Sequence, residues 1–437
     1  MLWLALGLLF AALVVSIARF RVHPFLALLL GSLAVGFAGG LKASELVTHL
    51  ITGFGRTMES IGLVIALGAV LGVALERSGS ARALAHYLLR KLGPTRTPLA
   101  LSLGGWAIAI PVFCDAGFVL MAPLLRALRS QTYSIPLLAV ALASGLYATH
   151  VFVPPTPGPL AAAATLEADV GLVLLLGLLT SLPAAAVGLL WAHCYATRFS
   201  AEMPEGPSAP EPDTPLSPLK ALTPIALPVV LIALRSIVLA FGAPSNKSWV
   251  HATLVFAGHP VIALLIGVLL ALMFKAPAGE MRQQRWIADG LTQAGSILLI
   301  TGAGGALGYV LQATGLGDKL GAALAAHPLG LWMPFLIAAL FKSAQGSSTV
   351  ALITTSALMA PLLPAMGLTS ELARVLVVLA MGAGAMVVSH LNDSYFWVVA
   401  QFSGMNMTTA LRTFSLATLF QGLAGILTVT LLYYVLL

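Results

Sequence analysis

The stretch SHLNDSYFWVV, residues 389–399, decides how this chain folds, because four polar side chains interrupt a run that is otherwise apolar enough to cross a bilayer. They are His390, Asn392, Asp393 and Ser394. An ionisable side chain at membrane depth costs about 2.5–3.5 kcal/mol on insertion scales, so it faces a cavity or a partner rather than lipid. The segment is therefore interpreted either as a functional site or as a buried His–Asp pair that tethers two helices.

The composition indicates a membrane protein. Of 437 residues, 59% are hydrophobic and only 8% are charged, and the mean hydropathy is +0.99. Such a chain cannot hide its apolar side chains in one soluble core. Apolar runs of about 20 residues, the length that a helix needs to cross a bilayer, recur along the sequence. We therefore predict an all-α polytopic protein in a lipid bilayer. The net charge of +7 does not indicate a nucleic-acid partner, because Lys and Arg lie mostly in short connections between spans.

Ten segments are expected to span the membrane, and two others are expected to be hairpins. The expected spans are 2–18, 25–41, 60–76, 134–165, 170–197, 222–243, 259–274, 293–313, 371–402 and 413–437. Residues 98–128 and 328–365 each hold an apolar arm, a polar tip and a second apolar arm, with no charged loop between the arms. We interpret both as re-entrant hairpins, although two complete short spans are the alternative.

A proline-rich acidic segment divides the chain near its middle. Residues 198–220, RFSAEMPEGPSAPEPDTPLSPLK, predict an extended linker between a first part, 1–197, and a second part, 221–437. With the N-terminus outside, most Lys and Arg fall in connections on the inner side. The positive-inside rule then places the linker inside and both chain termini outside.

The two parts resemble each other in sequence. GAVLGVALERSG at 68–79 matches GGALGYVLQATG at 304–315, and further on His150 falls opposite His390. Chance similarity between Gly- and Ala-rich helices is the alternative. Each part has about five expected crossings plus one hairpin, and an odd number of crossings turns the second part upside down. We therefore predict two inverted repeats, which is the symmetry of a transporter.

The tip of the second hairpin is the densest polar segment. Lys342 offers a cation, and its neighbours offer hydroxyls, an amide and a glycine that allows close approach of a ligand. These neighbours are Ser343, Gln345, Gly346, Ser347, Ser348 and Thr349. One carboxylate with several hydroxyls fits this set. The alternative is that the hydroxyls cap the second arm and Lys342 reaches the surface.

The first part carries the matching interruptions. Prolines at 154, 155, 157 and 159 forbid a continuous helix through the span 134–165, so it must break into two half-helices. Irregular backbone at membrane depth lines a cavity or is buried in protein, and half-helix N-termini suit a small anion. The tip of the first hairpin brings Asp115 and Gly117, where Asp115 is either a site residue or the N-cap of the second arm.

Three acids are candidates for proton coupling. Asp393 comes first, with His390 three residues away as its modulator, because proton shuttling near neutral pH requires a carboxyl withdrawn from water. Asp115 is the second candidate. Glu59, which lies just before a span, is the weaker third, and an interfacial role is its alternative. No metal or cofactor is expected, since Cys114 and Cys194 have no Cys or His at ligand spacing.

Three blocks in series resemble the GntP family of gluconate permeases, within the ion transporter superfamily. They are FGRTMESIGLVIALGAVLGVALERSG (54–79), FKSAQGSSTVALITT (341–355) and SHLNDSYFWVV (389–399). The resemblance implies proton-coupled uptake of gluconate or a related sugar acid across the bacterial inner membrane, so both termini would be periplasmic. It also implies a scaffold domain and a mobile domain that moves as an elevator, and it carries over His150 and Thr156 as contacts.

The sequence therefore predicts a secondary active transporter and no enzyme, since no HExxH, GxSxG or paired-carboxylate motif is present. D-serine or another small hydroxy acid is an alternative substrate, and sodium is an alternative coupling ion. A membrane enzyme or a channel is the remote alternative. A homo-oligomer is possible from the sequence.

Overall fold

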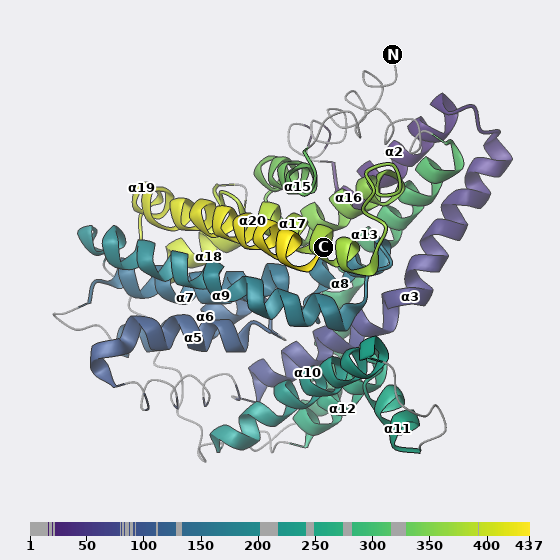
Figure 1. Cartoon of the computed structure of the whole chain (residues 1–437). Helices are drawn as coiled ribbons and strands as arrows, with labels where there is room; N and C mark the ends of the chain where they lie inside the picture. The colour runs from purple at the N-terminus through teal and green to yellow at the C-terminus, as the bar shows by residue number, and fades with distance from the viewer. Residues whose placement is uncertain are drawn as a thin grey trace.

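The computed structural model describes residues 22–78, 93–110, 112–127, 133–201, 217–241, 249–273, 282–315, 329–391 and 393–437, with positions 16, 20, 80, 83, 87 and 91. Within these ranges every regular element is a helix (Figure 1). The predicted first span, 2–18, lies outside the described residues except for position 16. Of the predicted linker, 198–220, residues 202–216 also lie outside them. The all-α fold class is confirmed.

Several described helices are long and apolar enough to cross a membrane. Four stretches qualify directly, and two more qualify if each pair of helices joined at a sharp bend counts as one span. The four are Ile135–Thr165, Val170–Arg198, Gln284–Leu311 and Met407–Leu436. The first of them is fully enclosed by protein, which makes it the centre of the molecule.

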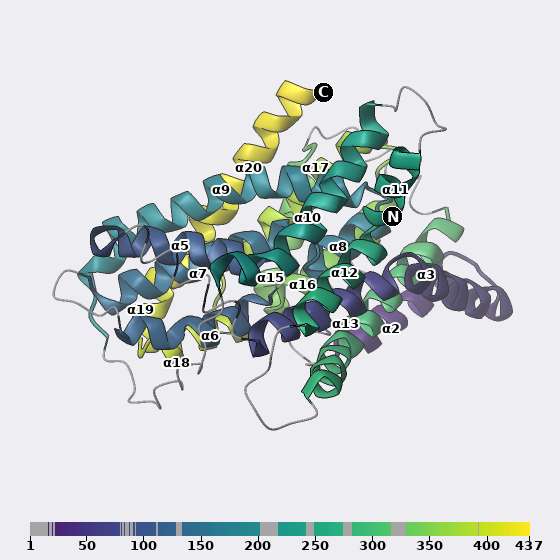
Figure 2. The same cartoon turned by 90° about the horizontal axis from the view of Figure 1, so that it is seen from below.

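The helices pack into two units. The outer unit contains α2 (Pro24–Ala38), α3 (Ala43–Arg77), α10 (Pro218–Phe241), α11 (Trp249–Ala257), α12 (Pro260–Leu272) and α13 (Arg282–Ala313). Its main seam joins α3 and α13, which approach closely because Gly53 and Gly305 have no side chains there: an added Cβ would lie 2.7 Å from Gly305 O and 1.8 Å from Thr57 Oγ1, respectively. In Figure 1 this unit lies on the right and lower side of the molecule, and in Figure 2, seen from below, parts of it overlap the remaining helices.

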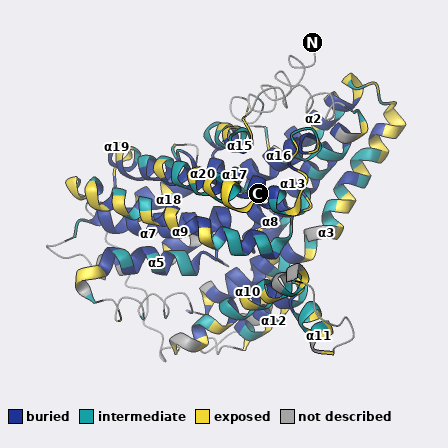
Figure 3. Ribbon diagram, in the orientation of Figure 1, coloured by how far each residue is buried: buried dark blue, intermediate teal, exposed yellow. Residues whose placement is uncertain are grey.

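The core unit holds both hairpins and both broken spans. From the first half it takes α5 (Thr97–Ile108), α6 (Cys114–Ala127), α7 (Ile135–Phe152), α8 (Pro157–Thr165) and α9 (Val170–Cys194). From the second half it takes α15 (Trp332–Gln345), α16 (Ser348–Met359), α17 (Glu371–Met386), α18 (Ser394–Phe402), α19 (Met407–Ala410), a π-turn at Leu411–Ser415 and α20 (Leu416–Leu436). Short 3₁₀ turns at Pro94–Arg96, Ala196–Arg198 and Ala360–Leu362 complete the helices. Burial is densest along α7, α16 and α17 (Figure 3).

Both predicted breaks are confirmed. The first span stops being helical after Phe152 and resumes at Pro157, because the intervening prolines cannot donate backbone hydrogen bonds. The second stops after Met386 and resumes at Ser394, with Val388 in the left-handed region at φ 51° and Asp393 as the N-cap of the new helix. Backbone groups are thus exposed at two places deep inside an apolar protein.

The hairpin arms are short. α5 and α6 have 12 and 14 residues, and α15 and α16 have 14 and 12. A straight crossing needs about 20 residues. Arms of this length fit hairpins that enter and leave on the same side, as the sequence predicts.

Each hairpin packs on the broken span of its own half with a close approach of backbones. A Cβ added to Gly145 of α7 would lie 1.9 Å from Ser102 O of α5, and one added to Gly384 of α17 would lie 2.1 Å from Phe335 O of α15. Conversely, the second arm of each hairpin packs on the broken span of the other half, α6 on α18 and α16 on α8. These contacts are reciprocal, as two related repeats require, while the inverted orientation of the repeats stays a prediction.

Some element boundaries differ from expectation. α3 begins at Ala43 rather than near residue 60, because Leu46 is fully buried and extends the helix's packing face. α13 begins at Arg282 rather than at 293, and its first turns are amphipathic, with buried Trp286 beside exposed Arg285. α11 was not expected, and it joins α12 at a bend of 69°.

Candidate functional site

One polar cavity lies where both hairpin tips, both broken spans and α13 meet. Its volume is about 220 Å³, far above the ~10–15 Å³ that one water needs on the same measure. It is lined by Phe113, Cys114, Asp115, Tyr147, His150, Ile297, Ile300, Ser347, Ser348, Thr349, Val350, Ile353, Asp393, Ser394 and Tyr395. The sequence predicts this meeting of four interruptions, and the structure brings them to one place.

A buried ion pair stands behind the cavity. Lys342 Nζ lies 2.6 Å from Asp393 Oδ2, and the side chains are 1% and 5% exposed. The lysine ammonium also donates to the carbonyl of Gly346 and lies 5.6 Å from the centroid of the Tyr147 ring. Lys342 does not line the cavity, so the structure places it as the partner of Asp393 rather than as an open cation at the tip.

Asp393 is held by more than the lysine. The Ser389 hydroxyl donates to the carboxylate oxygen that also accepts from Lys342, and the backbone N–H of Tyr395 donates to the other oxygen at 3.0 Å. Each of these three donors stabilises the ionised carboxylate. Asp393 therefore caps α18 and joins it to the second hairpin.

Asp115 lies across the cavity in the first turn of α6. Its partners are weak: the Ser394 hydroxyl donates to Oδ1 at 3.4 Å, and the Cys114 thiol lies 4.0 Å from Oδ2. Ser394 opens α18, so this contact links the first hairpin tip to the second broken span. The two carboxylates of the cavity thus differ sharply in how many donors they have.

His150 closes α7 beside the first break, with an exposed fraction of only 5%. Its ring stacks at 6.5 Å on Tyr147 and lies 6.0 Å from the ring of Phe113. Its Nδ1 is buried and has no hydrogen-bond partner among the described residues. A buried ring nitrogen without a partner, in the wall of a polar cavity, is a group that a ligand or water can satisfy.

The second hairpin tip presents the start of α16. Gly346, at φ 90°, ends α15 and turns the chain, and the Ser347 side chain then accepts the N–H of Val350 as N-cap. Ser348 and Thr349 occupy the first two helical positions, where backbone N–H groups have no acceptor within the helix. The cavity therefore has a helix N-terminus with partial positive charge in its wall.

Other predicted residues lie outside the cavity lining. Glu59 is exposed on α3. The His390 ring donates from Nε2 to the Ser343 carbonyl at 3.1 Å behind the tip, and buried Gly117 packs against Leu146. Asn392 and the side chain of Gln345 lie outside the described residues.

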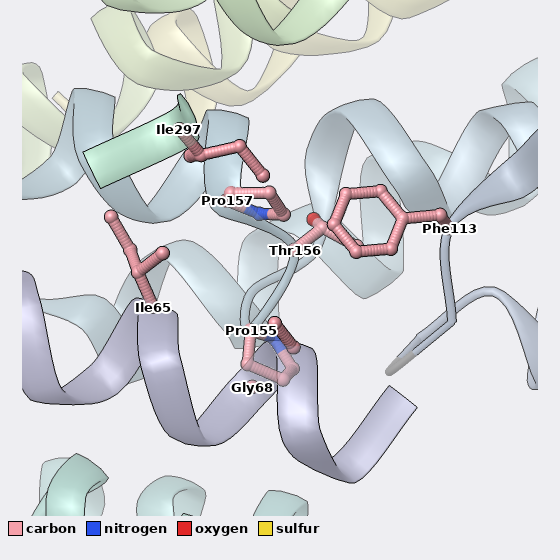
Figure 4. Close-up of a pocket in the computed structure, with 8 residues that line it drawn as sticks. Ile65, Gly68, Phe113, Pro155, Thr156, Pro157 and Ile297 are labelled. Atoms are coloured by element: carbon pink, nitrogen blue, oxygen red, sulfur yellow. The ribbon is translucent and has the colours of Figure 1, made fainter. Parts of the chain in front are cut away.

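Thr156 lies in a smaller space of about 10 Å³, which has room for about one water. Its hydroxyl donates to Val153 O at 2.6 Å within the break. The proline-bounded loop around it rests between Ile65 and Gly68 of α3 and Ile297 of α13 (Figure 4). This loop is a contact between the core unit and the outer unit.

Three lining residues of the main cavity that carry a hydroxyl or a thiol were missed from the sequence. Tyr147 and Tyr395 sit in apolar runs and differ in no sequence feature from packing aromatics, and Cys114 has no partner at ligand spacing. Position beside a break is the signal that could have found them, since Tyr147 lies three residues before His150 and Tyr395 follows Asp393 by two.

Apolar crossing helices around a polar cavity, with two broken spans and two short hairpins at its edge, are the architecture of a transporter. Solved structures share this fold. The YdaH transporter of Alcanivorax borkumensis matches with a TM-score of 0.68 at 16% identity, over 95% of this chain and 99% of that one. MtrF of Neisseria gonorrhoeae matches with a TM-score of 0.62 at 15% identity, over 95% and 96% of the two chains.

The chain belongs to the GntP permease family, whose model matches residues 1–435. It is 35% identical to the inner membrane permease YgbN of Escherichia coli K12, over 95% of this chain and 94% of the relative. It is 34% identical to a gluconate permease of Pseudomonas aeruginosa, over 97% and 96%, and 32% identical to a high-affinity gluconate transporter of Escherichia coli K12, over 93% and 94%. The resemblance read from the three sequence blocks is confirmed: the chain is a multi-pass membrane permease and no enzyme.

Proposed function

We propose that this permease takes up gluconate or a related sugar acid together with protons. The observation that carries the proposal is the cavity of about 220 Å³, whose wall combines a helix N-terminus, hydroxyls and two carboxylates. Relatives named for gluconate and for L-idonate, the latter 31% identical over 95% of this chain, support a sugar-acid substrate.

The substrate carboxylate is assigned to the start of α16. Ser348 and Thr349 offer backbone N–H groups and hydroxyls there, and the helix dipole favours a negative charge. The hydroxyl-bearing end then reaches Ser394 and the unpartnered Nδ1 of His150. No Lys or Arg is among the described lining residues, so the helix end and the distant Lys342 are the positive groups available to an anion.

The charges around the cavity support proton coupling. Asp115 and Asp393 bring two negative charges against one positive charge on Lys342. An incoming carboxylate would add a further negative charge in a place poor in water, at a cost of several kcal/mol. A proton that enters with the substrate removes that excess.

Alternating access is assigned to movement of the core unit against the outer unit, as in an elevator. Ile297 and Ile300 of α13 are the outer unit's contribution to the cavity wall, and every other lining residue belongs to the core unit. Sliding the core unit along α3 and α13 therefore replaces only this apolar wall. The predicted periplasmic termini and the inner-membrane location accompany this proposal, the location supported by the relative YgbN.

The test is uptake of labelled gluconate into proteoliposomes. An imposed inward pH gradient without sodium should drive accumulation above the outside concentration, and a protonophore should abolish it. A panel of gluconate, L-idonate, glycerate and D-serine then ranks the substrates. Uptake that ignores the protonophore and needs sodium overturns the coupling assignment, and accumulation of D-serine in preference to both sugar acids overturns the substrate assignment.

A further inference from the structure

The two cavity carboxylates cannot share one role. Asp393 accepts from Lys342, Ser389 and the Tyr395 backbone, all within a nearly water-free site. Protonating it would break its charge pairing and leave the lysine as an unpaired buried cation. Asp115 has no cation in contact among the described residues, and its single hydroxyl donor is at 3.4 Å. Protonation of Asp115 breaks no ion pair.

The surroundings of Asp115 add to this difference. The facing titratable groups are Cys114 beside it, Tyr147 and His150 on α7, and Asp393 and Tyr395 at the start of α18, with Lys342 beyond Asp393. α3 and α5 also pack on α6, but neither contributes a described residue to the cavity lining. The fixed charge nearest in the lining is thus another carboxylate, whose repulsion favours neutral Asp115 once an anion is present.

We propose that Asp115 holds the transported proton, while Lys342 and Asp393 stay a charged pair that positions the two broken elements. This inference rests on the proposed proton-coupled function and reverses the order of candidates given by the sequence, which puts Asp393 first. With Asp115 ionised, the three groups carry one net negative charge, and an anionic substrate makes it two. With Asp115 protonated, the net charge of the substrate-bound site is again one negative charge. Binding of the anion and binding of the proton to Asp115 therefore stabilise each other.

The proton count on binding tests the inference directly. Calorimetric titration of gluconate into the purified full chain, in two buffers of different ionisation enthalpy, gives the number of protons taken up per substrate. At pH values above the titration of Asp115 in the free protein, wild type should take up close to one proton per substrate, and over that same range its Kd should rise by up to about tenfold per pH unit. Asp115→Asn should bind gluconate with no proton uptake and with a Kd that does not change with pH.

Matched variants separate the alternatives. Asp115→Glu keeps a carboxyl group and should keep the proton uptake. If Asp115→Asn does not fold, Asp115→Ser is used in its place. The double variant Lys342→Met with Asp393→Asn removes both charges of the pair and should keep an uptake close to one proton. In proteoliposomes, Asp115→Asn should still exchange gluconate across the membrane at no less than about a tenth of the wild-type rate, but should lose accumulation.

The outcomes divide cleanly between the two proposals. A wild type that binds gluconate without proton uptake overturns proton coupling and this inference with it. A wild type that takes up a proton, together with an Asp115→Asn variant that takes up the same proton, overturns this inference alone. Loss of the proton uptake in the double variant, with its retention in Asp115→Asn, transfers the role to Asp393.

Discussion

Removing one partner of the Lys342–Asp393 pair should destabilise the protein far more than removing both. At 2.6 Å and an effective dielectric constant of about 20, the attraction amounts to about 6 kcal/mol. Desolvation of two ions offsets most of this attraction, so the intact pair contributes little net stability. A single substitution is different, because it leaves the other ion buried and unpaired, at about 3–5 kcal/mol.

The assay is thermal unfolding in detergent, followed by tryptophan fluorescence. Lys342→Met and Asp393→Asn should each melt on the order of 5 °C below wild type. The double variant should regain most of the lost melting temperature, because no buried charge is left without a partner. The remaining difference comes from the Ser389 hydroxyl and the Tyr395 N–H, which then donate to an amide instead of a carboxylate. Single variants that melt with wild type, or a double variant that melts below both, would refute the reasoning.

Three further predictions concern other parts of the chain. Gly145→Val should destabilise the protein by about 1–3 kcal/mol or more, because its Cβ would lie 1.9 Å from Ser102 O. The control Gly55→Ala, where an added Cβ has nothing within 4 Å, should be neutral or slightly stabilising. Equal melting temperatures for the two variants would contradict the close packing at Gly145. Glu59→Gln should leave the pH dependence of uptake unchanged, because Glu59 is exposed on α3, and a flattened pH profile would return it to the proton path. In a Cys194→Ser background, alkylation of Cys114 should be slowed several-fold by gluconate, because Cys114 lines the cavity; labelling at the same rate with and without gluconate counts against that placement of the substrate.

The sequence predicts the breaks in the two spans well because their causes are local. Pro154 and Pro155 stop the helix after Phe152 whatever surrounds them, and Asp393 caps α18 through its own side chain, which accepts the N–H of Tyr395. The meeting of the four interruptions was also predictable, since polar groups in an apolar protein must find one another.

The division of labour at the site was not predictable, because it depends on contacts between distant segments. Lys342 and Asp393 are 51 residues apart, and the sequence does not indicate that they form an ion pair rather than lining the cavity. The same holds for Tyr147 and for the start of α3, where helix length follows from burial of Leu46 against α2. Only the folded arrangement distinguishes Asp115, which has weak contacts with a hydroxyl and a thiol, from Asp393, which has three donors including a lysine.

The crossed contacts of the hairpins have a consequence for biosynthesis. α8 packs on α16 and α6 packs on α18, so each broken span of one half is covered by an arm from the other half. During translation the proline break at 153–156 leaves the ribosome long before α16 exists. Until α16 is synthesised, the polar backbone of this break is not covered by α16. Water, lipid headgroups or an insertion factor must satisfy its hydrogen bonds during that time. Only synthesis of the last third of the chain can close the centre of the protein.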